Sequence, residues 1–355
     1  MTRRVSTISA ISTRRATPTR RQRGLSLVEL MVSMTLSLLL LTALATLYFN
    51  TSRARNAFAN SSEQIENGRY ALDIMSRELE LAGFFGPSNV AGGAVVSAPD
   101  ICATDPTALG FSGSPATVPL AVQGFAPGAV APCLPNLLPG SEILAVRRVS
   151  TTPVSAPAVG TPYLQASYCA DDTVPLVFDA SAPAFKLRTK ACDSATPSEL
   201  RAAVVRIFYL AGCDQCTGTG DGKPTLKMAE LIDGAFRVQA VANGIEDLHL
   251  AYGVDLDGNG APDCYVADPG VDNSAACTGI PGYDWSVPLA NWRNVTAVQV
   301  RLLARTATLT DGWTDQRTYD LGRAQASGPF RDGYKRHVYA ELARVANVAG
   351  SRESQ

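Results

Sequence analysis

Hydrophobic positions are distributed very differently in the two parts of the chain. Near the N-terminus they form one continuous run from Leu25 to Phe49, and the only ionisable side chain within it is Glu29. At about 1.5 Å per residue, about 20 such residues cross the roughly 30 Å hydrocarbon core of a bilayer. Residues 25–49 are therefore predicted to form a transmembrane helix.

The segment 50–83 changes from continuously apolar to amphipathic. No proline and only one glycine, Gly68, lie between Leu25 and Gly83, so we expect one helix of about 59 residues. Its apolar stripe has four positions at seven-residue spacing and two more on the same side: Phe58, Ile65, Leu72 and Leu79, then Met75 and Ala82. This stripe predicts a helix face that packs on a sheet, with a coiled coil as the alternative for any heptad.

The remaining residues, 84–355, have the pattern of a β-rich head. Residues 86–141 are dense in Pro, Gly, Ala and Ser, which predicts a loop-rich insertion with little regular structure. Later runs rich in β-branched residues predict five strands: Glu142–Val149, Val204–Leu210, Ile245–Tyr252, Val295–Leu303 and Val338–Val345.

Two of these runs alternate between apolar and polar positions. Leu248, Leu250 and Tyr252 oppose Asp247, His249 and Ala251, while Val298, Val300 and Leu302 oppose Gln299, Arg301 and Leu303. Alternation of this kind is typical of an antiparallel sheet with one buried face. We therefore expect an α+β fold in which the long helix covers the apolar face of the sheet.

Charge predicts the orientation of the transmembrane helix. The first 24 residues contain no acid and seven arginines: Arg3, Arg4, Arg14, Arg15, Arg20, Arg21 and Arg23. The positive-inside rule places this segment in the cytoplasm and the residues after Asn50 outside. Without these arginines the chain keeps 24 basic and 32 acidic side chains, a net charge of −8. We therefore expect no duplex nucleic acid as a primary partner.

The eight cysteines all lie beyond the hydrophobic run: Cys102, Cys133, Cys169, Cys192, Cys213, Cys216, Cys264 and Cys277. An even number of cysteines on one side of a membrane segment is typical of disulfides in an oxidising compartment. The head is therefore predicted to be extracytoplasmic and to contain disulfides.

Glu29 is the one position in the apolar run that the membrane environment disfavours. A carboxylate inside a transmembrane helix costs at least about 2.5 to 3.5 kcal/mol on insertion scales, so it should have a partner. Neither a secretory signal peptide nor a mitochondrial transit peptide accounts for it. The alternative is a plain signal anchor in which the glutamate reaches towards the interface.

The residues around Glu29 supply a specific explanation. The order RQRGLSLVELMVS, residues 21–33, resembles the prepilin signature of type IV pilins. The resemblance implies that residues 1–24 are a leader, which a prepilin peptidase removes after Gly24. It also implies that Leu25, where the family most often has Phe, becomes an N-methylated N-terminal residue. The new amine on Leu25 would then pair with Glu29 of a neighbouring subunit.

Other parts of the chain extend this resemblance. The run NGRYALDIMSRELELAGFFG, residues 67–86, is similar to the end of the long helix in minor pilins of the PilW kind. The segments that begin at Trp292 and Tyr334 resemble the last strands of PilW-like minor pilins and of J-type pseudopilins of type II secretion.

The resemblance implies a minor pilin that takes part in type IV pilus assembly, in the priming or tip complex, where a bulky head has room. Its location would be the inner membrane, with a single-pass anchor and a periplasmic head, and then the fibre or its tip at the cell surface. Its partners would be other minor pilins, the major pilin and a tip adhesin. A J-type pseudopilin stays open as the near alternative.

An acidic loop directly after the run Ile245–Tyr252 is the sharpest motif of the head. Its oxygen-bearing residues take positions 1, 3, 5, 7 and 9 of an EF-hand-like loop, with Gly260 at position 6: Asp255, Asp257, Asn259, Ala261 through its carbonyl, and Asp263. Position 12 is Val266 instead of the usual glutamate. A Ca²⁺ site is predicted, with a metal-free acidic turn as the alternative. Such a loop also resembles one that many PilW-like heads carry.

The motif Cys213-Asp-Gln-Cys216 has the spacing of a redox centre or of half a zinc site. Turn residues follow it instead of a helix, which favours a structural disulfide. Cys264 and Cys277 flank the segment after the acidic loop, and we expect a bridge between them. The competing hypothesis is a membrane-tethered periplasmic thiol oxidoreductase that uses Cys213 and Cys216.

Sequence motifs of common enzyme classes are missing from the chain. It has no Gly-x-Ser-x-Gly elbow and no Gly-x-x-x-x-Gly-Lys phosphate loop, and its two histidines, His249 and His337, both lie in predicted strands. Both histidines are expected on the polar faces of those strands. The prediction is a protein that is not an enzyme.

Overall fold

The computed structural model describes residues 24, 26–87 and 94–353. The chain divides after Asn56 into an N-terminal unit and a head unit, Ala57–Gln355, which are described separately. The helix α1, Leu27–Leu81, contributes residues to both units and confirms the predicted long helix. It ends at a pair of glycines in the left-handed region, Gly83 and Gly86, where other residues would be strained.

In the N-terminal unit every described position of α1 from Leu27 to Phe49 is exposed. This is the only described helix that is long and apolar enough to cross a membrane. Its serine and threonine hydroxyls do not add polar surface, because each donates to a backbone carbonyl three or four residues earlier: Ser33, Thr35, Ser37, Thr42, Thr46 and Thr51. The hydroxyl groups of this segment therefore donate within the helix, as a bilayer requires.

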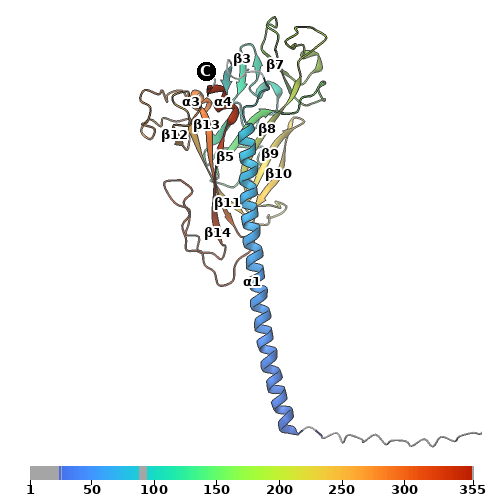
Figure 1. The fold of residues 1–355 in the computed structure, drawn as a ribbon, viewed down its shortest axis with the longest axis vertical. Helices are drawn as coiled ribbons and strands as arrows, with labels where there is room; N and C mark the ends of the chain where they lie inside the picture. The colour runs from blue at the N-terminus through green and yellow to red at the C-terminus, as the bar shows by residue number, and fades with distance from the viewer. Residues whose placement is uncertain (1–23, 25, 88–93, 354–355) are drawn as a thin grey trace, which may run out of the picture. The chain divides into compact units, whose positions relative to one another are not determined.

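Two antiparallel sheets form most of the head (Figure 1). The larger sheet has the order β10-β9-β8-β5-β4, and the pair β6 and β7 joins it at β8. Its strands are β4 (Val122–Phe125), β5 (Ile143–Val149), β6 (Tyr163–Ala166), β7 (Leu176–Asp179), β8 (Leu200–Ala211), β9 (Thr225–Ile232) and β10 (Ala235–Asn243).

The smaller sheet has the order β12-β11-β13-β14. It consists of β11 (Ile245–Val254), β12 (Cys264–Val266), β13 (Val295–Arg305) and β14 (Arg336–Arg344). The five predicted strands correspond to β5, β8, β11, β13 and β14, and the α+β fold with a long N-terminal helix and an antiparallel head is confirmed. Two short helices, α3 (Pro288–Arg293) and α4 (Ala346–Glu353), were not predicted.

The segment predicted to be a loop-rich insertion contains more structure than expected. It holds β1 (Val95–Ser97), η1 (Pro106–Ala108), β2 (Ser112–Gly113) and β3 (Ala116–Pro119), and it also supplies β4 of the larger sheet. A second 3-10 helix, η2 (Ala182–Ala184), follows β7. Gly124 in β4 lies directly against the ring of Tyr252, where any Cβ would overlap with it.

The same segment covers the outer face of the larger sheet. Ile101, Ala131 and Leu134 pack on Ile207 and Tyr209 of β8 in a hydrophobic cluster of their own. This cover explains why β5 and most of β8 are buried on both faces.

The helix half in the head packs between the two sheets. Leu72, Met75 and Leu79 belong to one core cluster with residues of both sheets, such as Phe208 and Leu250. The predicted stripe is correct only in its second half, because Phe58 and Ile65 are 76% and 45% exposed. A heptad drifts around a straight helix with 3.6 residues per turn, so the buried face runs instead through these residues: Gln64, Gly68, Ala71, Leu72, Met75, Ser76, Glu78 and Leu79.

The smaller sheet is not one-sided, which corrects the prediction. Leu303, expected on the solvent face, is fully buried against Tyr319 and Leu321 from the segment between β13 and β14. His249, also expected on a polar face, is buried with its Nδ1 2.8 Å from Glu142 Oε1. The segment 306–335 therefore covers the second face of the smaller sheet. The alternating pattern in the strands does not predict this cover.

Candidate functional site

The start of α1 has the geometry of a helix N-cap. The Glu29 backbone N–H donates to Ser26 Oγ at 3.2 Å, and the Leu30 N–H donates to the Ser26 carbonyl at 3.1 Å. Ser26 and Glu29 have the spacing of a capping box. Gly24 and the Glu29 side chain are exposed, while Leu25 lies outside the described residues. Sequence reasoning considered Glu29 only as an assembly residue and missed its position in the cap.

Glu29 has two possible local effects in this geometry. As the only acid in the first turn, it interacts favourably with the positive end of the helix dipole. It also remains open towards other molecules, since no ion pair within the described residues involves it. A carboxylate in this position can help the helix begin and can also receive an ammonium group from outside.

The acidic loop after β11 is held in shape by its own side chains. Asp255 is fully buried, and its two oxygens accept hydrogen bonds from the Gly258 and Gly260 N–H groups at 2.7 and 2.9 Å. Burial alone would raise the pKa of Asp255. The donors Gly260, Arg352 and Gly258 outweigh it, so the pKa is lowered.

Three of the five predicted calcium ligands converge. The carboxylate oxygens of Asp255, Asp257 and Asp263 lie within 4.8 Å of one another. The side chain of Asn259 instead serves the loop itself: its oxygen accepts from the Ala261 N–H at 2.7 Å, and its amide donates to Asp257. The three carboxylates therefore form an anionic cluster, and calcium here stays a prediction.

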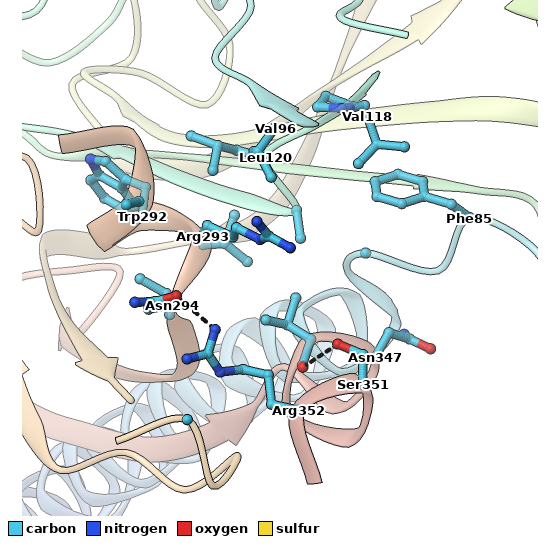
Figure 2. Close-up of a pocket in the computed structure, with 18 residues that line it drawn as sticks. Phe85, Val96, Val118, Leu120, Trp292, Arg293, Asn294, Asn347, Ser351 and Arg352 are labelled. Atoms are coloured by element: carbon cyan, nitrogen blue, oxygen red, sulfur yellow. Dashed lines mark hydrogen bonds between the residues drawn. The ribbon is translucent and has the colours of Figure 1, made fainter. Parts of the chain in front are cut away.

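Arg352 on α4 lies beside this loop and was not found from the sequence. Its Nε donates to Asp255 Oδ2, and its Nη1 donates to Asn294 Oδ1 at 2.6 Å (Figure 2). The same short helix holds the end of α1, because the Asn347 amide donates to the carbonyls of Glu80, Leu81 and Ala82. Helix α4 therefore connects α1 with the acidic loop.

A cavity of about 340 Å³ lies between α3, α4 and the strand β3. Figure 2 shows its apolar side, formed by Phe85, Val96, Val118 and Leu120, opposite Asn347 and Ser351 of α4. Arg352 also lines the cavity, and Figure 2 shows its hydrogen bond to Asn294. The cavity therefore lies between the small β1-β3-β2 sheet and the C-terminal helix.

All eight cysteines are paired in the structure. The disulfides are Cys102–Cys133, Cys169–Cys192, Cys213–Cys216 and Cys264–Cys277, the last being the bridge expected beyond the acidic loop. Cys213 and Cys216 close a turn between β8 and β9 and do not begin a helix. The Lys227 ammonium lies 3.2 Å from Cys216 Sγ.

Comparisons with known proteins agree with this architecture. Residues 19–45 match the family model of the Prokaryotic N-terminal methylation motif, which includes Gly24 and Glu29. Residues 207–347, from within β8 to the beginning of α4, match the family model Type IV Pilus-assembly protein W. These two matches support a type IV pilus minor pilin of the PilW kind. No curated protein and no solved structure matches it.

The two matches relate the features described above to a minor pilin. The methylation motif and the exposed apolar helix suit a minor pilin that is anchored in the inner membrane. The PilW match covers the smaller sheet, the strands β9 and β10 and the end of β8 in the larger sheet, the acidic loop and the cover between β13 and β14. The match to a pilus-assembly family implies interaction with other pilus components.

Proposed function

We propose that this PilW-like chain is a minor pilin of the priming or tip complex, joined to its neighbours through α1 and the Glu29 carboxylate. The observation that carries the proposal is Glu29 itself, an exposed acid in the first turn of an otherwise apolar helix. Removal of the leader after Gly24 would leave an amine on Leu25, four residues before Glu29. In low dielectric, that amine and a neighbour's Glu29 would attract each other strongly.

The head supports a terminal position in the fibre. It carries two sheets, a third small sheet and two long covering segments, 101–137 and 306–335. So bulky a head repeats poorly along a slender fibre, whereas a tip or priming complex leaves it room. Its proposed partners are other minor pilins, the major pilin and a tip adhesin, and the PilW match supports the pilus over a type II secretion pseudopilin.

The sharpest test separates the charge of Glu29 from its position in the helix cap. Glu29→Gln keeps a side chain that suits a capping box but removes the charge, whereas Ser26→Ala removes the cap and keeps the charge. Loss of a partner from a buried ion pair typically costs about 3 to 5 kcal/mol. We expect Glu29→Gln to lower the amount of the chain in sheared fibres by about tenfold or more, and Ser26→Ala to leave it nearly unchanged.

Two measurements accompany this test. Mass spectrometry of the mature chain should find an N-terminus at Leu25 in the wild type and in both variants. Immunoblots of membranes should show equal amounts of all three. Equal incorporation of Glu29→Gln and wild type, at equal membrane levels, would show that the charge has no role in assembly.

We also propose that the acidic loop binds Ca²⁺. The supporting observation is the convergence of three carboxylates, Asp255, Asp257 and Asp263, beside a single cation, Arg352. Oxygen ligands of this kind are those that Ca²⁺ prefers. Asp257 is the best position to test, because it is exposed and makes no contact with Arg352.

The test is a calcium titration of the mature chain in detergent, followed by its melting temperature. A ligand at about 100 times its Kd stabilises the native state by about 2.7 kcal/mol, so the wild type should melt several degrees higher. Asp257→Asn should lose this increase. Asp193→Asn, which changes another exposed aspartate that accepts a hydrogen bond two residues on, should keep it. A wild-type melting temperature that does not respond to calcium would remove the metal.

A further inference from the structure

A basic groove lies where α1 meets the segment between β13 and β14. We define it by Arg69 of α1 and by Trp313, Arg317, Lys335 and His337, and it encloses about 440 Å³. Two hydrogen bonds hold its walls together. Asn60 Nδ2 donates to Thr308 Oγ1 at 2.6 Å, and Gln64 Nε2 donates to the Lys335 carbonyl at 3.0 Å. The groove is therefore a fixed feature of the head, built on the helix that pilins use for packing.

The groove carries cations without carboxylate partners. Within the described residues, no ion pair involves Arg69, Arg317 or Lys335. Arg317 and Lys335 instead lie over the Trp313 ring, at 5.3 and 5.6 Å from its centroid. Trp313 is half-buried, and cations stacked on the open face of such a ring keep their charge available to a partner.

The charges below the groove do not cancel these cations. Arg336 is buried and pairs with Glu246, Asp315 and Asp332, while Arg305 pairs with Glu246. This network has a net charge of −1, from two cations and three carboxylates, against three cations in the groove above it. The groove as a whole is positive, on a chain that is acidic once the leader arginines are removed.

The adjacent flank of the same helix carries carboxylates and apolar side chains. Ile65, Glu66, Tyr70 and Asp73 line a shallow exposed hollow beside Arg69, and Ile65 and Tyr70 are 45% and 50% exposed. Exposed apolar side chains rimmed by charges are typical of an interaction surface. A pilin helix can therefore present carboxylates about two turns apart, as Glu66 and Asp73 are here, together with an apolar or aromatic side chain.

We propose that the basic groove binds the acidic face of the helix of a neighbouring pilin-like subunit. Carboxylates of that helix would pair with Arg69, Arg317 and Lys335, and an apolar side chain between them would contact Trp313. This inference rests on the proposed function as a fibre or priming-complex subunit, and it names the surface and the partner chemistry. Heterologous contacts of this kind suit helices packed side by side in an assembly.

The experiment places the photo-crosslinker p-benzoylphenylalanine at His337 in cells that assemble fibres. After irradiation, mass spectrometry of the adduct should identify a peptide from the helix of another pilin-like subunit, with carboxylates on one face of that helix. The paired substitution Arg317→Glu and Lys335→Glu should lower the adduct yield by about tenfold or more, because like charges then face each other.

Matched controls make the result specific. Lys190→Glu with Arg237→Glu changes the net charge equally at exposed positions outside the groove and should leave the yield unchanged. Replacing the partner's crosslinked carboxylates by lysine should restore the yield with the charge-reversed groove. Equal melting temperatures would show that the variants fold.

Several outcomes would overturn the proposal. These are an adduct with nucleic acid, lipid or a protein without a pilin helix, no adduct at all, or a yield that charge reversal does not change. The Glu29→Gln test keeps the two proposals apart. If Glu29→Gln prevents incorporation but the groove gives no pilin adduct, only the groove proposal fails. If the wild type never enters fibres but crosslinks to a pilin helix, the fibre role fails instead.

Discussion

At the scale of single residues, Glu78 is the polar contact that fixes α1 on the larger sheet. Its carboxylate accepts from Arg148 of β5 at 3.2 Å and pairs with Arg206 of β8. The side chains of Glu78 and Arg148 are each only 9% exposed. Arg206 also pairs with Glu230 of β9. Glu78 therefore belongs to a network of charged side chains from three strands.

Removing Glu78 should destabilise the head strongly. Glu78→Ala leaves the buried Arg148 guanidinium without its carboxylate, and breaking such a pair typically costs about 3 to 5 kcal/mol. Glu80→Ala, on the exposed side of the same turn, should cost no more than about 0.5 kcal/mol. Denaturant unfolding of the mature chain in detergent, followed by circular dichroism, measures both. Similar losses for the two variants would contradict the role of Glu78.

Residues of the candidate site differed in how far the sequence could reveal them. Glu29 and Gly24 were recognisable because the processing motif is local and contiguous. Arg352 was not, because it is 97 residues from Asp255 and only the folded chain brings them together. The same holds for Glu78, whose partners are 70 and 128 residues away.

At the scale of elements, Gly68 is a point of close approach between α1 and the smaller sheet. Its position is buried, and an added Cβ would overlap with the ring of Tyr339 in β14. In the sequence this glycine only weakened the apolar stripe. In the structure, the missing side chain is what allows the ring to lie on the helix.

Two glycine-to-alanine substitutions therefore should have opposite effects. Gly68→Ala forces Tyr339 to move, and overpacking of this kind typically costs about 1 to 3 kcal/mol. Gly350→Ala, in α4 with open space around it, should stabilise the protein by up to about 1 kcal/mol, because alanine is the better helix former. Melting temperatures of both variants test this. Stabilisation by Gly68→Ala would show that the helix can move away from the sheet at little cost.

The elements that were predicted and those that were missed differ in their patterns. Strands β11 and β13 alternate between apolar and polar residues in the sequence, and both were predicted. Strand β9 is buried at nearly every position and β10 is mostly exposed, and neither was predicted. The sequence analysis also missed their hairpin, although its turn residues Asp233 and Gly234, both at positive φ, are typical of a type I′ turn. Helix α4 is too short to show a period.

At the scale of the whole molecule, segments that the hydrophobic pattern did not predict cover the second faces of the sheets. Residues 101–102 and 129–137 pack on the outer face of the larger sheet, and the disulfide Cys102–Cys133 joins these two stretches. Tyr209 Oη of β8 also donates to the Pro135 carbonyl at 3.1 Å. Because these covers lack regular periodicity, the sequence predicted the sheet and the helix but not what shields their second faces.

This arrangement predicts that the disulfides contribute different amounts to the free energy of unfolding. In the chain-entropy account, a bridge across 31 positions stabilises by about 4 kcal/mol and one across 3 positions by about 2 kcal/mol. Cys102→Ser with Cys133→Ser should therefore lower the free energy of unfolding by about 2 kcal/mol more than Cys213→Ser with Cys216→Ser. Denaturant unfolding of both double variants in detergent measures this difference.

The same two variants compare a structural role of the Cys213–Cys216 bridge with thiol chemistry. A structural turn between β8 and β9 needs no exchange of its bridge, so a pilin without it should enter sheared fibres at the wild-type level. The variant without Cys102–Cys133 loses the clamp on its sheet cover and should be less abundant in membranes and fibres. If instead the Cys213–Cys216 variant folds normally but no longer supports fibre formation, the Lys227 ammonium beside Cys216 would point to exchange chemistry at this bridge.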